Sequence, residues 1–121
     1  MDLHLKGKRA LVTGSSSGIG AAIARELAAE GVSVVVHGRD AERATAVARE
    51  VEATGVRAAV VLGDVTTDAG ADAIANGALA ALGGIDILVN SAGGVVRSDN
   101  PQWMDMSSSE WLSARQSVIV R

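Results

Sequence analysis

A glycine-rich turn near the N-terminus most constrains what this chain of 121 residues can fold into. Residues 13–20 (TGSSSGIG) directly follow the apolar run 10–12 and open a stretch with helical periodicity. In such a unit, glycines let the backbone approach a phosphate closely, and the first N–H groups of the helix point at the anion. The turn therefore predicts a dinucleotide site, and the residues expected at its phosphates are Gly14, Ser15, Ser16, Ser17, Gly18, Ile19 and Gly20.

The same letters can occur by chance in a flexible loop before a helix, so the context of the turn matters. Here it lies between an expected buried strand and an expected helix, which favours phosphate binding over a plain connection. The three serines add hydroxyl donors. Because no Gly-Lys-Ser/Thr sequence ends the turn, it does not match the loop that binds nucleoside triphosphates.

Short valine-rich runs alternate with alanine-rich periodic stretches, which is typical of an α/β fold. We expect a Rossmann-like three-layer sandwich, in which helices cover both faces of a parallel sheet. The connections are long enough for helical crossovers, so the strand order should be 3-2-1-4. The predicted strands are 9–13, 32–37, 57–62 and 85–90, and the predicted helices are 18–30, 40–54 and 67–82.

Apolar periodicity gives each predicted helix a core face. Asp40 should cap the second helix, and Gly83 should help to end the third. Residues 107–110 (SSSE) fit a capping box that would begin a further helix, and residues 118–120 could fray, extend that helix or form a strand. The expected core residues are Ile19, Ile23, Leu27, Ala44, Val47, Ala48, Val51, Ile74, Ala78 and Leu82.

Charge and composition exclude several classes of partner. A formal net charge of -3 provides no basic field for nucleic acid or an anionic membrane. No segment is long and apolar enough to cross a membrane, and the N-terminus lacks a secretion signal, so we expect a cytoplasmic location. The chain has no cysteine, and His4 and His37 have no partner at ligand spacing, so no metal site is expected.

Three further motifs, taken with the turn, resemble the short-chain dehydrogenase/reductase family. Asp64-Val65 after the third strand resembles the acidic pair that contacts the adenine ring in that family. Residues 90–93 (NSAG) resemble its Asn-Asn-Ala-Gly motif, and residues 110–111 (EW) resemble the start of its fourth helix. The resemblance implies a single dinucleotide-binding domain over residues 1–121, matching the N-terminal half of the family fold. It adds these residues to the expected coenzyme contacts: Asp64, Val65, Asn90, Ala92 and Gly93.

The end of the second predicted strand bears on the choice of coenzyme. In the family, an acidic residue there binds the adenosine ribose and selects NAD. This chain instead has Gly38 followed by Arg39, whose planar guanidinium can bind a 2'-phosphate. The resemblance therefore implies NADP (NADPH) in preference to NAD.

Three of these residues also have structural interpretations. Arg39 could be a solvated loop arginine. Asp64 could cap or solvate the turn after the third strand. Asn90 could hold neighbouring backbone groups at a strand end even if it also serves the coenzyme.

The reacting half of the family does not match this chain. The family transfers a proton with the tyrosine of a Tyr-x-x-x-Lys pair, and the 121 residues contain no tyrosine. Lys6 and Lys8 precede the first strand, and Val118 stands where the family places an asparagine of its fourth helix. No catalytic residue is therefore carried over, and we expect a fragment, a truncated reading frame or a divergent protein.

Two functions follow. The first is the NADP-binding portion of an oxidoreductase that moves a hydride between nicotinamide and a carbonyl or secondary alcohol, with the reacting residues elsewhere. The alternative is a non-catalytic module that binds NADP(H) or a partner. Without the family's further strands, residues 85–89 would form a free apolar edge, so self-association or pairing with a missing C-terminal half is expected.

Overall fold

The computed structural model of the chain describes residues 4–91 and 119–120. Strands and helices alternate along them as the sequence predicts, with small shifts at their ends. The helix predicted to begin near 107–110 lies outside the described residues. The elements are β1 (Arg9–Thr13), α1 (Gly18–Ala29), β2 (Ser33–Gly38), α2 (Ala41–Glu52), β3 (Ala58–Leu62), α3 (Asp68–Leu82), β4 (Ile87–Asn90) and β5 (Ile119–Val120).

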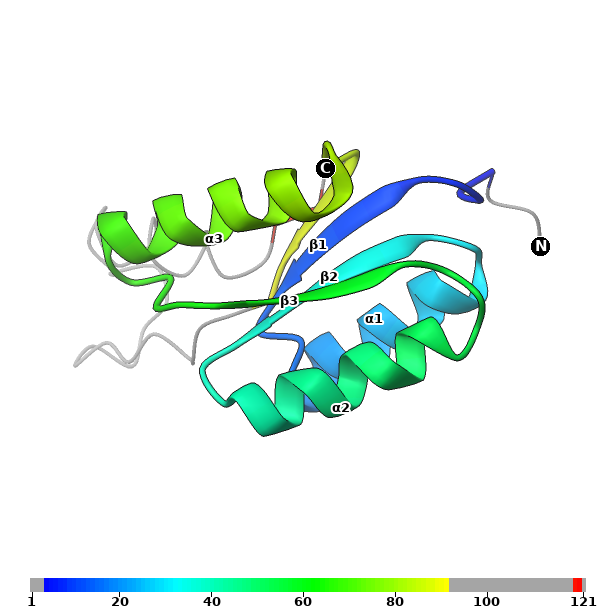
Figure 1. The fold of residues 1–121 in the computed structure, drawn as a ribbon, viewed down its shortest axis with the longest axis horizontal. Helices are drawn as coiled ribbons and strands as arrows, with labels where there is room; N and C mark the ends of the chain where they lie inside the picture. The colour runs from blue at the N-terminus through cyan, green and yellow to red at the C-terminus, as the bar shows by residue number, and fades with distance from the viewer. Residues whose placement is uncertain (1–3, 92–118, 121) are drawn as a thin grey trace, which may run out of the picture.

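The strands form a sheet in the order β3-β2-β1-β4-β5, in which the neighbours among β1 to β4 pair in parallel. β1 lies between β2 and β4, and its Leu11 is in register with Val35 on one side and Leu88 on the other. Figure 1 shows α1 and α2 on one face of the sheet and α3 on the opposite face. The predicted three-layer α/β sandwich with strand order 3-2-1-4 is confirmed.

The valines of β2 supply core to both faces of the sheet. Val34 and Val36 are fully buried in the cluster that includes α1 and α2, whereas Val35 is fully buried in the cluster that includes α3. Because successive strand side chains point to opposite faces, a strand covered on both faces needs an unbroken apolar run. The predicted core residues of α2 and α3 are all buried: Ala44, Val47, Ala48, Val51, Ile74, Ala78 and Leu82.

The predicted core face of α1 is wrong at Ile19 and only partly right at Ile23 and Leu27, which pack against the core without being fully buried. Ile19 is 78% exposed. Small residues occupy the buried face instead, and they let the helix lie close to the sheet while the larger side chains flank the contact. The buried residues of α1 are Gly20, Ala21, Ala24 and Ala28.

Side chains cap α2 and α3 at their N-termini. Asp40 accepts a hydrogen bond from the Glu42 N–H at 3.0 Å, and Thr67 Oγ1 accepts one from the Gly70 N–H at 3.0 Å. These oxygens satisfy N–H groups that have no acceptor within the helix. α3 ends before Gly83, whose φ of +78° favours glycine. The predicted cap at Asp40 and stop at Gly83 are therefore confirmed.

An ion pair joins the starts of β1 and β4. The Asp86 carboxylate accepts hydrogen bonds from the Arg9 backbone N–H at 2.9 Å and from Arg9 Nε at 3.1 Å. The Asp86 N–H in turn donates to the Arg9 carbonyl at 2.8 Å. β4 begins after this junction, at Ile87 rather than at the predicted Ile85. Hydrogen bonds from the Arg9 side chain and backbone lower the pKa of the Asp86 carboxyl.

One edge of the sheet differs from the prediction. The edge of β4 expected to be free over residues 85–89 is paired with β5 only at the end of the strand, Val89 with Val120 and Asn90 with Ile119, in antiparallel fashion. Of the alternatives for 118–120, residues 119–120 therefore form a strand, because β-branched side chains favour extended backbone and β4 offers unpaired backbone groups.

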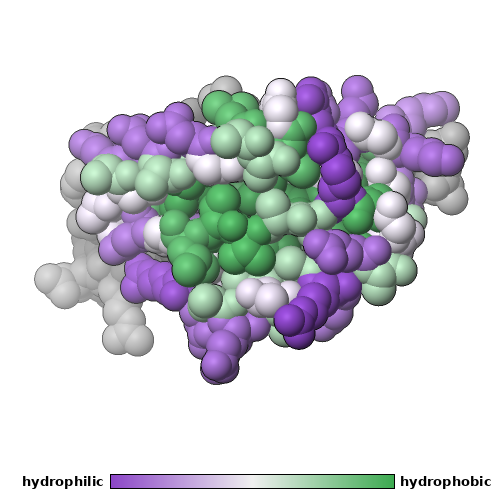
Figure 2. Space-filling model, viewed as in Figure 1, coloured by the Kyte–Doolittle hydropathy of each residue, from purple (hydrophilic) through white to green (hydrophobic). Residues whose placement is uncertain are grey.

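The opposite edge of the described sheet is β3. Figure 2 shows hydrophobic side chains gathered on the face of the molecule where β3 runs between α3 and α2. Two exposed hydrophobic residues of these elements are Leu62 in β3 and Leu79 in α3, which are 47% and 49% exposed. Such an apolar edge is a surface on which another chain can pair.

We expect the Asp86→Asn substitution to lower the free energy of unfolding at neutral pH and to leave it nearly unchanged in acid. The pKa of Asp86 is lowered in the folded state. Its carboxylate therefore adds to the free energy of unfolding above the ordinary carboxyl pKa of about 4, and this addition is lost as the pH falls through the folded-state pKa. Urea unfolding at several pH values measures this. Asp72→Asn, an exposed carboxylate of α3, is the control, and a stability difference that does not change with pH would contradict the assignment.

Candidate functional site

The candidate site lies at the carboxyl end of the sheet. The strand order reverses at β1, since β2 and β3 lie on one side of it and β4 lies on the other. In open parallel sheets, ligands bind outside the carboxyl ends of the strands at such a point. The turns after β1, β2 and β3 and the end of β4 lie at this edge, and they carry the predicted site residues that fall within the described part of the chain.

The glycine turn after β1 allows close contact between α1 and the strand end. Gly14 has a φ of +64° and Gly18 a φ of +58°, a region that favours glycine. A Cβ added at Gly20 would collide with the Gly14 carbonyl oxygen and would lie 2.7 Å from Ser91 Oγ. Only glycine therefore permits this approach of helix to strand.

The N-terminus of α1 differs from those of α2 and α3. Its N-cap residue, Ser17, is extended and makes no side-chain cap hydrogen bond. The Ala21 N–H donates to the Ser17 carbonyl at 3.2 Å, which begins the helical pattern. The N–H groups of residues 18–20 precede this bond, and they lie at the positive end of the helix dipole. This end of α1 can therefore bind an anion.

The three serines of the turn have different environments. Ser15 is fully buried: its hydroxyl donates to the Val12 carbonyl at 2.6 Å, and its N–H donates to the His37 carbonyl at 2.8 Å. Both donors of Ser15 are thus used within the protein. Ser16 is partly buried and Ser17 is exposed, so these two remain at the surface of the turn.

His37 is the main residue that sequence reasoning missed, because it was considered only as a metal ligand. It is 3% exposed at the end of β2. Its Nδ1 accepts a hydrogen bond from the Gly14 N–H at 2.9 Å, and its Nε2 lies 2.8 Å from the Gly63 carbonyl oxygen. The available signal was a histidine that directly continues the buried run 34–36.

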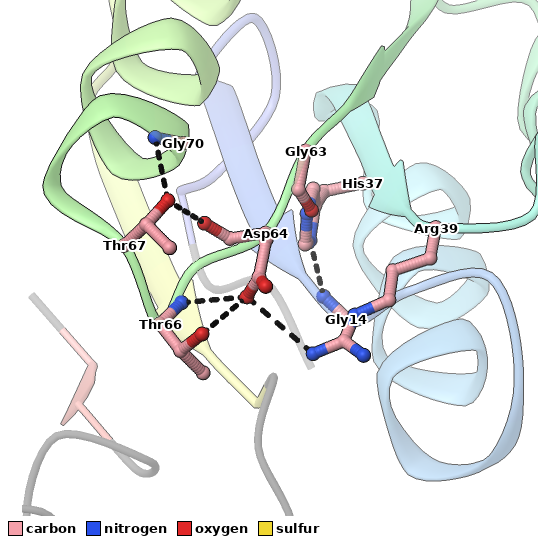
Figure 3. Close-up of polar contacts among 8 residues, drawn as sticks. All are labelled: Gly14, His37, Arg39, Gly63, Asp64, Thr66, Thr67 and Gly70. Atoms are coloured by element: carbon pink, nitrogen blue, oxygen red, sulfur yellow. Dashed lines mark hydrogen bonds and ion pairs between the residues drawn. The ribbon is translucent and has the colours of Figure 1, made fainter.

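Arg39 and Asp64 meet at the ends of neighbouring strands (Figure 3). Arg39 Nη2 lies 3.4 Å from Asp64 Oδ1, and the two side chains are 73% and 46% exposed. Asp64 Oδ1 also accepts hydrogen bonds from Thr66 Oγ1 at 2.6 Å and the Thr66 N–H at 2.9 Å. These bonds from Thr66, together with the charge of Arg39, lower the pKa of the Asp64 carboxyl. Asp64 therefore does support its turn, as one interpretation of the sequence held.

Of the remaining predicted residues, some are described by the structure and others are not. Val65 packs against the hydrophobic cluster on the α3 side of the sheet. Asn90 Oδ1 accepts a hydrogen bond from Thr13 Oγ1 at 2.8 Å, and Ser91 Oγ donates to the Thr13 carbonyl at 2.6 Å. Asn90 and Ser91 thus tie β4 to the end of β1. Ala92 and Gly93 lie outside the described residues.

Two further searches cover only the part of the chain that the structure describes. Within residues 4–91 and 119–120, no group of three or more histidine, cysteine, aspartate or glutamate side chains could hold a metal ion. In the same part of the chain, no helix combines the length and the apolar character needed to cross a membrane.

Comparison with known proteins finds a matching family model and related dehydrogenases. The family model for short chain dehydrogenases matches residues 8–116. The 3beta-hydroxysteroid dehydrogenase 1 of Eggerthella lenta is 44% identical over 108 residues, which are 88% of this chain and 40% of that protein. The 7alpha-hydroxysteroid dehydrogenase of Escherichia coli K12 is 38% identical over 113 residues, which are 93% of this chain and 43% of that protein.

A solved structure gives the same result. L-sorbose reductase from Gluconobacter frateurii, complexed with NADPH and L-sorbose, superimposes with a TM-score of 0.76 at 38% identity and covers 97% of this chain and 47% of its own. The chain thus spans less than half the length of these relatives. The match of the family model over most of the sequence and the shared sheet order lead to one conclusion: the chain belongs to the short-chain dehydrogenase/reductase family of oxidoreductases.

Proposed function

We propose that this chain is the NADP-binding portion of a short-chain oxidoreductase, which moves a hydride between nicotinamide and a carbonyl or secondary alcohol. One observation carries the proposal: two groups that can bind anions follow neighbouring strands. The N-terminus of α1, which has no side-chain cap, follows β1, and the cationic Arg39 follows β2. Both groups attract anions, and NADP carries two anionic groups in one molecule, its pyrophosphate and its 2'-phosphate. When bound, NADPH supplies the hydride.

The described residues fit the parts of the coenzyme. The N–H groups of the α1 N-terminus would bind the pyrophosphate, and Arg39 would bind the 2'-phosphate. Family resemblance assigns the adenine ring to Asp64 and Val65. Ser15 acts indirectly, by holding the turn. The proposed contacts are Gly14, Ser16, Ser17, Gly18, Ile19, Gly20, Arg39, Asp64, Val65, Asn90, Ala92 and Gly93.

Two contacts support NADP over NAD. Among the residues that the structure describes, Arg39 is paired only through an exposed contact with Asp64. Exposed ion pairs contribute little free energy, so the guanidinium can bind a phosphate instead. A Cβ at Gly38 would lie 2.6 Å from Ser16 Cβ and closer still to Ser16 Oγ. An acidic residue at position 38, which would favour NAD, therefore does not fit unless Ser16 moves.

A second function rests on a separate observation, the absence of tyrosine from the 121 residues. It favours a module that binds NADP(H), or a partner subunit, and catalyses no reaction. A cytoplasmic location and self-association are parts of the proposal as well, and the apolar edge at β3 supports self-association in addition to the edge of β4.

The Arg39→Ala substitution tests the preference for NADP. We expect it to weaken NADPH binding about ten- to a hundredfold, as a charged hydrogen bond is lost, while NADH binding stays nearly the same. Isothermal titration calorimetry measures both affinities. Arg43→Ala removes another exposed arginine and is the matched control. Equal losses for the two coenzymes would show that Arg39 does not recognise the 2'-phosphate.

The Gly38→Asp substitution tests the steric limit at the end of β2. Alone, we expect it to weaken both coenzymes, because its Cβ collides with Ser16. Combined with Ser16→Gly, it should bind NADH better than the single variant does, since the collision is removed. The Ser16→Gly variant alone is the control. If Gly38→Asp binds NADH as tightly as the double variant, Ser16 imposes no such limit.

Nicotinamide absorbance separates the two proposed functions. We expect the chain alone, mixed with candidate ketones and NADPH, to leave the coenzyme unoxidised, because no tyrosine is present to transfer the proton. The same mixture with a complete family enzyme is the positive control. Sustained NADPH oxidation by this chain would refute the view that its own residues lack the reacting groups.

A further inference from the structure

His37 is bonded to two turns at the carboxyl edge of the sheet (Figure 3). Its Nδ1 contacts the Gly14 N–H at 2.9 Å, in the turn after β1, and its Nε2 contacts the Gly63 carbonyl at 2.8 Å, in the turn after β3. The His37 backbone is held as well, because its N–H donates to Ser15 Oγ at 3.0 Å and its carbonyl accepts from the Ser15 N–H at 2.8 Å. The buried ring is therefore fixed at both nitrogens and at its own main chain.

These contacts determine which nitrogen of the ring carries the proton. Nδ1 accepts a hydrogen bond from an N–H, so it has no proton of its own. The Gly63 carbonyl can only accept, so Nε2 must donate. The imidazole is therefore the neutral Nε2–H tautomer. A charged ring would direct a second N–H at the Gly14 N–H and break that contact.

We propose that His37 is a positioning residue for the coenzyme, and this inference rests on the function proposed above. Gly14 begins the turn that leads to the anion-binding end of α1, and Gly63 immediately precedes Asp64, the partner of Arg39. By bonding to both, the ring sets the separation between the pyrophosphate end and the adenosine end of the site.

The bond matters because glycine cannot hold the turn by its own conformational preference. Gly14 has a φ of +64°, and a glycine is free to leave this conformation when nothing else restrains it. The Gly14 N–H needs an acceptor, and a partly buried donor without one is costly. Loss of the imidazole acceptor would therefore release the first residue of the phosphate-binding turn.

The first test is independent of any ligand. In the ligand-free chain, ¹⁵N chemical shifts of the imidazole nitrogens report the tautomer, and His4→Asn removes the only other histidine, so the remaining signals belong to His37. We expect the Nε2–H tautomer at neutral pH. A charged ring, or the Nδ1–H tautomer, would overturn the assignment.

The second test compares two substitutions that each keep one of the two ring hydrogen bonds with a third that keeps neither. Asn at position 37 keeps an acceptor at the place of Nδ1, Gln keeps a donor near the place of Nε2, and Leu keeps neither. We expect His37→Asn to bind ADP-ribose within about threefold of the native chain, and His37→Gln and His37→Leu to bind it about tenfold more weakly. Comparing Asn with Gln retains a decisive result even if the Leu variant does not fold.

The affinity pattern also separates positioning from a purely structural role. Loss of the Gly14 contact should weaken NADPH, NADH and ADP-ribose by the same factor, because all three carry the pyrophosphate. Equal affinities of the Asn and Gln variants, with only their melting temperatures changed, would overturn the proposal. If the native chain binds none of the three compounds, the proposed function fails, while Gly14 amide exchange in the Asn and Gln variants still decides whether His37 fixes the turn.

Discussion

The site depends on the close contact between α1 and the end of β1. No Cβ fits at Gly20, because it would meet the Gly14 carbonyl oxygen and Ser91 Oγ. The same closeness continues along the helix through its alanine face, which lies against the sheet where larger side chains would hold it away. The N-terminus of α1 therefore begins directly at the strand end, where its N–H groups can meet an anion.

Polar groups at the carboxyl edge divide into two sets. Ser15, His37 and Asn90 bond to neighbouring strands and turns, and they fix the shape of the edge. Ser17 and Arg39 are exposed and belong to the surface of the site. The first set holds the second in place, because its hydrogen bonds join the neighbouring strand ends and turns of this edge.

Much of the fold could be predicted because its signals are local. The valine run of β2, the cap at Asp40 and the stop at Gly83 each depend on a few neighbouring residues, and the strand order follows from the lengths of the connections. The face of α1 could not be read in the same way, since periodicity records where apolar residues fall but not how closely a helix can approach a sheet.

The polar network of the site was harder to predict than its location. The glycine turn, Asp64 and Asn90 are motif positions and could be found in one sequence. The contacts of His37 with Gly14 and Gly63 join residues more than twenty positions apart, and only the folded sheet brings them together. The pairing of β4 with β5 is likewise a long-range contact that no local pattern indicated.

The hydrogen bonds from Thr66 to Asp64 have a consequence for how Arg39 can change partners. If the guanidinium swings away toward an incoming anion, the carboxylate keeps the hydroxyl and amide of Thr66 and remains half open to water. The departure strands no dehydrated charge, so the exchange has a low electrostatic barrier. The contact with Asp64 would then place the Arg39 guanidinium beside the site when no anion is bound, and it would release the guanidinium easily when an anion binds.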